Sequence, residues 1–301
     1  MRVLVTGATG FVGRWLIREL EAAGHQPVPA PGSDVVDITD QLAVSRLVAG
    51  ARPDAIAHLA GVSHAMDAMS DPDHALAVNA GGTNLVIQAA AASGRPIAVL
   101  VTGSSEVYGK PEPEDLPLGE NSPLRADRPY GRSKLAQEQT AIEAGARDHL
   151  PVVVTRSFNH TGPGQRRDFV APALAHRVIE AKRTGRVDVA VGDLDVRRDI
   201  GDVRDVARAY RLLLEGLAAG SVPAGTVVNV ATGKAVAIRW VLEVISRIVG
   251  VAVRPRVDPA LLRDDDPPLI VGDPSRLARL TGWSPAIPLE QTLRDLVASV
   301  D

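Results

Sequence analysis

Tyr130 and Lys134 lie four residues apart in the stretch PYGRSK. On a helix, this spacing places both side chains on one face. A tyrosine hydroxyl has an ordinary pKa of about 10, and a neighbouring ammonium favours the phenolate and lowers that pKa. The pair is therefore predicted to exchange a proton with a hydroxyl or carbonyl oxygen near neutral pH, with Tyr130 as the acid or base. The alternative is a surface helix pair, because this spacing is common by chance.

Residues 103–109 read GSSEVYG, which places hydroxyl groups and a carboxylate at the end of an apolar run. Ser104, Ser105 and Glu106 are candidates for one wall of an active site, where hydroxyls bind a substrate oxygen and a carboxylate acts as a base. An ordinary turn is the alternative, with the Glu106 carboxylate in solvent or bonded to loop N–H groups. Tyr108 is predicted to be structural.

Three glycines, Gly7, Gly10 and Gly13, follow the first apolar run in VLVTGATGFVG. At a strand-to-helix turn, one glycine makes the tight turn, one lets the backbone approach a pyrophosphate, and one allows the helix to pack closely on the strand. The helix N-terminus then offers free N–H groups and the positive end of its dipole to phosphate. The order of strand, turn and helix predicts a dinucleotide site rather than an ordinary turn.

The end of the second predicted strand bears on the choice between NAD(H) and NADP(H). NAD-dependent folds usually carry an acid there, which accepts from the ribose 2′-OH, whereas this chain reads QPVPAPG with no acid close behind. Arg14 follows the third glycine, and a guanidinium suits a 2′-phosphate. The sequence favours NADP(H) over NAD(H); a solvated helix residue is the alternative for Arg14.

Short β-branched runs alternate with longer helical segments over the first half of the chain. The runs are continuously apolar, as is typical of a parallel sheet covered on both faces. Repeated strand–helix–strand order predicts an α/β, Rossmann-like doubly wound fold. The predicted strands are residues 2–6, 54–60, 97–103, 152–156 and 227–231, and the predicted helices include residues 13–24, 72–93, 130–147 and 172–185.

The strand–helix pattern loosens after about residue 160, and the tail is rich in proline, aspartate and arginine. We therefore predict two units. A Rossmann domain takes residues 1–160 plus about 199–235, and a smaller, partly interleaved C-terminal substrate domain takes about 161–198 and 236–301. The boundary between two such domains is the usual place for a ligand.

The bulk composition excludes several classes of protein. The chain has 301 residues and a formal net charge of −3, which gives no reason to expect a nucleic-acid or membrane-surface partner. It has no cysteine, and no histidine spacing typical of a metal site, so no metal is expected. No apolar run approaches the roughly 20 residues of a spanning helix, and no signal-peptide pattern opens the chain. A cytoplasmic protein is predicted.

Taken together, TGATGFVG, HLAG (58–61), NAGGTNLV (79–86), GSSEVYG and YGRSK resemble the extended short-chain dehydrogenase/reductase family over nearly the whole chain. The resemblance implies that Tyr130 is the catalytic acid or base, that Lys134 holds the nicotinamide ribose, and that Ser104 binds the substrate oxygen, with Glu106 as a further catalytic candidate. It also implies cofactor contacts from Gly7, Thr9, Gly10, Phe11, Val12, Gly13, Arg14, Asp37, Ile38, Leu59, Ala60, Gly61, Asn79, Thr102, Tyr130, Lys134 and Ser157.

The second half of the chain, including RSFNHTGPGQRRDFV (156–170) and RRDIGDVRDVARAY (197–210), resembles enzymes that act on GDP-6-deoxy-4-keto-hexoses. The implied activity is NAD(P)H-dependent reduction of the 4-keto group to a GDP-rhamnose-type product, and TGPGQ favours this over the related GDP-mannose 4,6-dehydratases. The implied substrate contacts are Ser104, Ser105, Glu106, Asn159, Val170, Arg198, Arg263 and Asp266.

One departure and several alternatives remain. Residues 263–266 read Arg-Asp-Asp-Asp where reductase relatives often read Arg-Pro-Ser-Glu/Asp, which leaves the nucleotide-side contacts open. A dehydratase with Glu106 as its base, and a 4-epimerase, are alternatives because the same Ser, Tyr and Lys serve all three reactions. An NADP-sensing regulatory protein is the non-enzyme alternative. The resemblance further implies a homodimer, paired through helices 72–93 and 130–147.

Overall fold

The computed structural model describes residues 1–262 and 265–300, and a six-stranded parallel sheet forms its centre. The strand order is β2-β1-β3-β4-β5-β9. The order reverses at β1, because β2 lies on one side of it and β3 on the other. The predicted doubly wound α/β fold is confirmed. The strands are β1 (Arg2–Thr6), β2 (Gln26–Pro29), β3 (Ala55–His58), β4 (Ala98–Ser104), β5 (Val152–Ser157) and β9 (Thr226–Val230).

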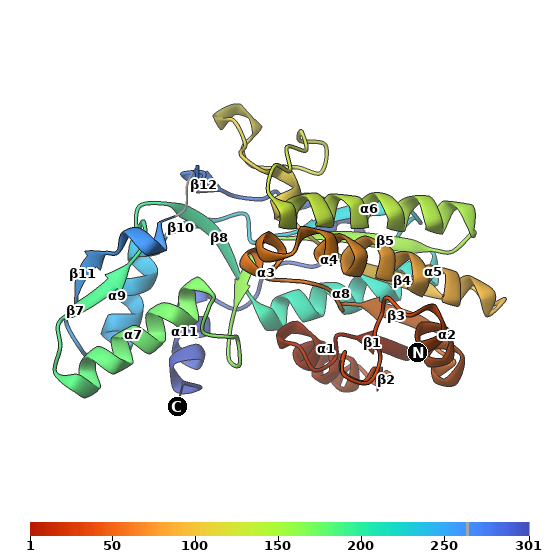
Figure 1. Cartoon of the computed structure of the whole chain (residues 1–301), viewed down its shortest axis with the longest axis horizontal. Coiled ribbons are helices and arrows are strands. Elements are labelled where there is room, and N and C mark those ends of the chain that lie inside the picture. The colour runs from red at the N-terminus through yellow and green to blue at the C-terminus, as the bar shows by residue number, and fades with distance from the viewer. Residues whose placement is uncertain (263–264, 301) are drawn as a thin grey trace.

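Alternate side chains of β1, β3, β4, β5 and β9 enter two separate hydrophobic cores. Val3 and Val5 of β1 pack into one core and Leu4 into the other, which explains why the strands are apolar throughout. Figure 1 shows α6 and α8 on opposite sides of this sheet. The first core is covered by α1 (Phe11–Ala22), α8 (Val203–Ala219) and α10 (Ser275–Thr281), and the second by α2 (Gln41–Ala51), α5 (Gly82–Ala92) and α6 (Pro129–Arg147).

A smaller group of elements lies at the other end of the molecule, together with the C-terminus (Figure 1). A third core joins its helices α7 (Val170–Thr184), α9 (Ile238–Val249) and α11 (Leu289–Ala298). The domain boundaries given above stay a prediction. The strands of this region are β6 (Asn159–Thr161), β7 (Asp188–Val191), β8 (Arg197–Asp202), β10 (Ala235–Ala237), β11 (Arg254–Val257) and β12 (Leu269–Ile270); β7 pairs with β11, and β8 pairs with β6, β10 and β12.

The helix predicted over residues 72–93 is interrupted by a π-helical turn, a feature that is frequent at functional sites. Asn79 lies within this turn, and its side chain bonds both backbone groups of Val62, at 2.9 and 3.2 Å. None of the helices in the described ranges is long and apolar enough to cross a membrane. The short elements are α3 (Ala65–Ser70), α4 (Pro72–Leu76), the π turn η1 (Ala77–Gly81), and the 3₁₀ helices η2 (Ser105–Tyr108), η3 (Pro113–Asp115) and η4 (Pro259–Leu261).

Candidate active site

The candidate side chains meet at the carboxyl ends of the parallel strands. Thr6 is in register with His58, and Ser104 is in register with Ser157, so β1, β3, β4 and β5 end at one edge. Ligands of open α/β sheets bind at this edge, where the strand order reverses. Here the reversal falls at β1, the strand that enters the glycine turn.

The turn between β1 and α1 has room for backbone alone. Gly7 has a φ of +67°, and a Cβ there would lie 2.8 Å from the Ala60 nitrogen. A Cβ on Gly13 would lie 2.2 Å from the Gly7 oxygen. The helix begins after Gly10, and no side chain caps its first N–H groups. An uncapped helix N-terminus that a ligand can approach closely suits a pyrophosphate, so the residues present fit a dinucleotide cofactor.

The next predicted cofactor residues border this turn. The backbone nitrogens of Leu59 and Ala60 each donate to Thr6 Oγ1 at 3.1 Å, which ties the segment after β3 to the end of β1. Within α1, Phe11 and Val12 open the first turn. The Arg14 guanidinium is exposed there and donates through Nε to Thr9 O at 2.8 Å, so its remaining nitrogens face solvent beside the turn.

Asp37 and Ile38 lie between β2 and α2 and form another border of the site. The Asp37 carboxylate accepts from the Thr39 backbone nitrogen at 2.8 Å and from its hydroxyl at 2.7 Å, and these bonds hold the pKa of Asp37 below its usual range. Ile38 packs on the start of α5, where a Cβ on Gly82 would come within 2.9 Å of Ile38 Cδ1. The segment therefore has a defined position against α5.

The Ser104 side chain lies beside Tyr130 at the end of β4, close enough to influence the pKa of the phenol. Ser104 Oγ accepts from the backbone nitrogen of Glu106 at 3.2 Å, at the start of η2. The helix that carries Tyr130 comes close to this strand end because residue 131 is glycine: a Cβ on Gly131 would lie 2.6 Å from Glu106 O. Ser105 and Glu106 are both partly exposed.

Burial raises the pKa of Tyr130, and the Glu106 carboxylate adds to the increase, while the Ser104 side chain opposes it. The expectation that Lys134 lowers this pKa is therefore wrong. Removing a phenol from water disfavours the phenolate, and the Lys134 ammonium is bonded to other groups. Tyr130 is protonated at neutral pH, which is the state that donates a proton.

Lys134 reaches the same site from α6 and is 5% exposed. Its Nζ donates to Thr102 O at 3.1 Å and to Gln137 Oε1 at 2.7 Å. Burial lowers the pKa of Lys134 to about 8. Gly61 lies beside it, where a Cβ would be 3.6 Å from Nζ and 2.6 Å from Asn79 Oδ1. An ammonium has three N–H donors, so the protein uses two of them.

Ser157, at the end of β5, is held in place by Tyr210, a residue that was not among the predicted site residues. The Tyr210 hydroxyl lies 2.7 Å from Ser157 Oγ, and Thr155 Oγ1 lies 3.3 Å from it. Burial raises the pKa of Tyr210. The sequence signal that could have identified Tyr210 is the helical spacing of apolar residues in α8. This spacing places Tyr210 on the same buried face as Leu213.

Two histidines lie near the site, His58 in the HLAG motif and His160 in the segment 156–170. His58 is fully buried with Nδ1 2.8 Å from Thr6 Oγ1, and burial together with the Lys134 charge lowers its pKa to about 3. His160 of β6 stacks on Phe11 of the glycine turn, with ring centroids 6.1 Å apart, and burial lowers its pKa. Within the described ranges, no three side chains of the metal-binding types are grouped to hold a metal ion.

A buried ion pair connects α6 to β5 beneath the site. The Arg156 guanidinium lies 2.6 and 2.8 Å from the Glu138 carboxylate oxygens, and the two side chains are 5% and 6% exposed. Arg156 also donates to the Tyr108 hydroxyl at 3.1 Å, and that hydroxyl donates to Asn229 at 2.7 Å. The tyrosine of GSSEVYG therefore lies in the core, and its hydroxyl is occupied there.

Two of the predicted substrate residues bond each other. Arg198 of β8 forms an ion pair with Asp266 at 2.7 Å and donates to Pro267 O at 2.8 Å. The resemblance implied a substrate contact for each of these side chains, and the structure pairs the two with each other. Arg263 lies outside the described residues.

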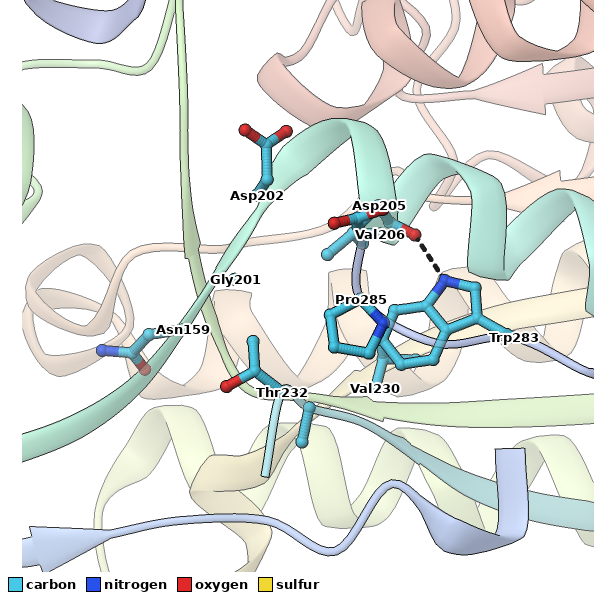
Figure 2. Close-up of a pocket in the computed structure, with 10 residues that line it drawn as sticks. Asn159, Gly201, Asp202, Asp205, Val206, Val230, Thr232, Trp283 and Pro285 are labelled. Carbon is cyan, nitrogen blue, oxygen red and sulfur yellow. Dashed lines mark hydrogen bonds between the residues drawn. The ribbon is translucent and has the colours of Figure 1, made fainter. Parts of the chain in front are cut away.

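A small cavity lies next to Asn159, between β8 and the loop that carries Trp283 (Figure 2). Its volume is about 10 Å³, which is room for about one water molecule. Trp283 Nε1 donates to Asp205 O at 2.9 Å across one side of it, and the Asn159 amide points away from the indole. The cavity is too small for a nucleotide sugar. Asn159 and Val170, the first residue of α7, are both exposed, and their predicted contact with the substrate stays a prediction.

Residues 3–231 match the NAD dependent epimerase/dehydratase family. The chain belongs to this family. One curated relative, the GDP-6-deoxy-D-mannose reductase of Pseudomonas aeruginosa, is 36% identical over 302 residues, which cover 99% of this chain and 96% of the relative. The resemblance drawn from the motifs, and the prediction of an NAD(P)-dependent enzyme, are confirmed.

Solved structures show the same architecture in this epimerase/dehydratase family. RMD from Pseudomonas aeruginosa, complexed with NADPH, has a TM-score of 0.90 and 33% identity, with 99% of this chain and 98% of that one covered. The Thermus thermophilus UDP-glucose 4-epimerase, complexed with NAD, has a TM-score of 0.85 and 28% identity, with 99% and 98% covered. These similarities confirm the cofactor class as NAD(P), and both forms occur among the similar structures.

Proposed function

We propose that this chain reduces the 4-keto group of a GDP-4-keto-6-deoxy-hexose with NADPH, giving a GDP-rhamnose-type product. One observation carries the proposal: Tyr130 and Ser104 lie together at the sheet edge, beside a turn that fits a dinucleotide, and burial raises the pKa of Tyr130 so that it keeps its proton. Reduction of a carbonyl needs such a proton donor. Similarity to the Pseudomonas GDP-6-deoxy-D-mannose reductase over nearly the full length of both chains supports the substrate class.

Each side chain has a separate task in this reaction. When bound, the cofactor supplies a hydride to the carbonyl carbon. Ser104 holds the carbonyl oxygen, and Tyr130 donates its phenolic proton to that oxygen as the alcohol forms. Lys134 uses its third N–H to hold the ribose. The backbone at Gly7 and Gly13, with the N-terminus of α1, holds the pyrophosphate.

We assign the nucleotide side of the substrate to β8 and the segment that precedes β12. The Arg198 guanidinium lies there in its ion pair with Asp266, and a guanidinium is well suited to a diphosphate. Asn159 and Val170 face the sugar side, and Ser105 borders the reacting carbon. Guanine as the base, and the cytoplasm as the place of action, remain predictions.

A dehydratase is the competing reading, because Glu106 stands next to Tyr130 where a base is needed. A single assay separates the two: the protein is incubated with GDP-mannose and NADPH, with and without a separate GDP-mannose 4,6-dehydratase, and the products are identified by NMR. We expect NADPH oxidation and a 6-deoxyhexose product only when this protein and the dehydratase are both present. Conversion of GDP-mannose by this protein on its own would reject it.

The preference for NADPH is assigned to Arg14. Replacing Arg14 with alanine is expected to raise the KM for NADPH by about 10- to 100-fold, the equivalent of a charged hydrogen bond of about 1.5–3 kcal/mol, and to leave the KM for NADH nearly unchanged. The control is Arg18→Ala, one turn further along α1, where the guanidinium lies over Trp15 instead. An unchanged ratio of the two KM values in Arg14→Ala would contradict the assignment.

The outer faces of α5 and α6 are assigned to a homodimer. A surface hollow of about 310 Å³ lies between these helices and η1. Its lining combines small residues, among them Gly81, with the polar and charged side chains of Asn84, Thr140, Glu143 and Arg147. We expect light scattering to give twice the 31.7 kDa of the chain. Gly81→Arg should then give the monomer, because a Cβ at Gly81 meets no atom within 4 Å in the single chain and the substituted side chain would project into the interface. A monomeric wild-type protein would refute the dimer.

The kcat/KM for NADPH is expected to fall as the pH rises through about 8, because the Lys134 ammonium then loses its proton. Unfolding is not the cause. The pKa of Lys134 is about 8 in the folded protein, whereas an unfolded lysine has a pKa of about 10.4. Between these two pH values the unfolded chain binds more protons than the folded one, so the contribution of Lys134 to stability rises with pH. Rate profiles from about pH 6 to about pH 10 test this; a level profile to the upper limit would be the contrary result.

A further inference from the structure

Lys134 is held by a side chain that belongs to none of the sequence motifs. Gln137 lies three residues further along α6 and is completely buried. Its Oε1 accepts from Lys134 Nζ at 2.7 Å, the shorter of the two bonds that the protein makes to this ammonium. We propose that Gln137 is a positioning residue, which sets both the place and the charge of Lys134; the inference rests on the proposed function of that lysine.

The orientation of the Gln137 amide is fixed from its other end. Its Nε2 donates to Thr83 Oγ1 at 2.9 Å. The Thr83 hydroxyl donates its own proton to Asn79 O at 2.7 Å. Since a hydroxyl has one proton to give, Thr83 must accept from the amide NH₂ group, and the amide oxygen must face Lys134. The position needs an acceptor at one end and a donor at the other, which glutamine has and glutamate lacks.

The same bonds belong to a buried polar network between α6 and the π turn. Asn79 Nδ2 donates to Ser133 Oγ at 2.9 Å, and Ser133 Oγ donates to Tyr130 O at 2.8 Å. The side chains of Asn79, Thr83 and Gln137 have no exposed surface. Breaking one bond in such a network leaves a buried polar group unpaired. The network therefore fixes α6, which carries Tyr130 and Lys134, against α5.

Gln137 stabilises the ammonium by a hydrogen bond and leaves its charge uncompensated. Burial is the one cause of the lowered pKa of Lys134, so no carboxylate among the described residues offsets its charge. A neutral acceptor therefore leaves the positive charge of Lys134 for the ribose. The titratable groups that face this region are His58 from β3, Tyr130 from α6, Glu106 from η2, and Glu138, which is paired with Arg156 of β5.

Two substitutions of Gln137 are expected to move the titration of Lys134 in opposite directions. Gln137→Glu places a carboxylate against the ammonium and should raise the lysine pKa by about one to three pH units. Gln137→Met keeps the length of the side chain and removes the acceptor, so the pKa should fall below the wild-type value. The titration is read from the lysine side-chain NMR signal that disappears in Lys134→Arg, in the cofactor-free protein. The Kd for NADPH, measured across the same pH range, should follow it.

Gln139 supplies the matched control, because it lies on the same helix and is exposed. Gln139→Glu and Gln139→Met should leave the Lys134 titration and the Kd for NADPH unchanged. If Gln137 merely fills the core, its variants lower the Tm while Lys134 titrates as in the wild type, and the inference is overturned. If the titrations move as expected but the wild-type protein binds no NADPH, the inference about Lys134 stands and the proposed function fails. Should Gln137→Glu not fold, Gln137→Met decides alone.

Discussion

Tyr130→Phe is expected to lower kcat for ketone reduction by about 10²- to 10⁴-fold, the usual contribution of a positioned acid or base. The substitution removes the phenolic oxygen and leaves the ring, so the packing of α6 changes little. The raised pKa of Tyr130 keeps its proton in place for donation, and the serine partner is a far weaker acid. The loss should appear in kcat at saturating NADPH and substrate, followed as NADPH oxidation, while the Kd for NADPH changes little.

The matched control uses another of the chain's three tyrosines. Tyr108 is buried, and its hydroxyl bonds Arg156 and Asn229 rather than a reacting group. Tyr108→Phe should lower the free energy of unfolding and leave kcat near the wild-type value. Turnover of Tyr130→Phe close to that of the wild type would remove Tyr130 from its assigned task.

Glu138→Gln is expected to lower the free energy of unfolding by about 3–5 kcal/mol, the usual cost of breaking a buried ion pair. The Arg156 and Glu138 side chains are 5% and 6% exposed, so the substitution leaves a guanidinium in the interior without its counterion. Urea unfolding of the wild type and the variant measures the difference.

Two further variants test the cause of this loss. Arg156→Met combined with Glu138→Leu should restore much of the stability, since replacing both charges removes the unpaired one. Glu180→Gln breaks an exposed pair with Arg183, whose side chains are 54% and 73% exposed, and should change the free energy of unfolding by no more than about 1 kcal/mol. Equal urea midpoints for Glu138→Gln and Glu180→Gln would show that the buried pair adds nothing.

The central sheet and the glycine turn could be predicted because their signals are local. A strand buried on both faces must be apolar at every position, as β1 is from Val3 to Val5. Gly7 and Gly13 are required because a Cβ on either residue would lie 2.8 or 2.2 Å, respectively, from a backbone atom. One long helix in the second half could also have been predicted from its pattern. Helix α9 has buried apolar residues at helical spacing, Ile238, Val241, Leu242 and Ile245.

The electrostatics of the site could not be predicted, because they depend on burial and on partners distant in the sequence. The spacing of Tyr130 and Lys134 suggested a lowered tyrosine pKa, but the fold buries the phenol and engages the ammonium elsewhere. Arg198 and Asp266 lie far apart in the chain and meet because β8 and β12 pair. Sequence spacing shows which side chains share a helix face, and tertiary packing decides which of them carry charge.

The most direct measurement follows deuterium from the cofactor to the sugar. The protein is incubated with GDP-4-keto-6-deoxymannose, prepared by a separate dehydratase, and with NADPH that carries deuterium at both hydrogen positions of nicotinamide C4. The product is examined by NMR. The account predicts deuterium at C4 of the hexose and one NADPH oxidised for each product molecule. A product without deuterium at C4, or conversion of the sugar without net oxidation of NADPH, would contradict it.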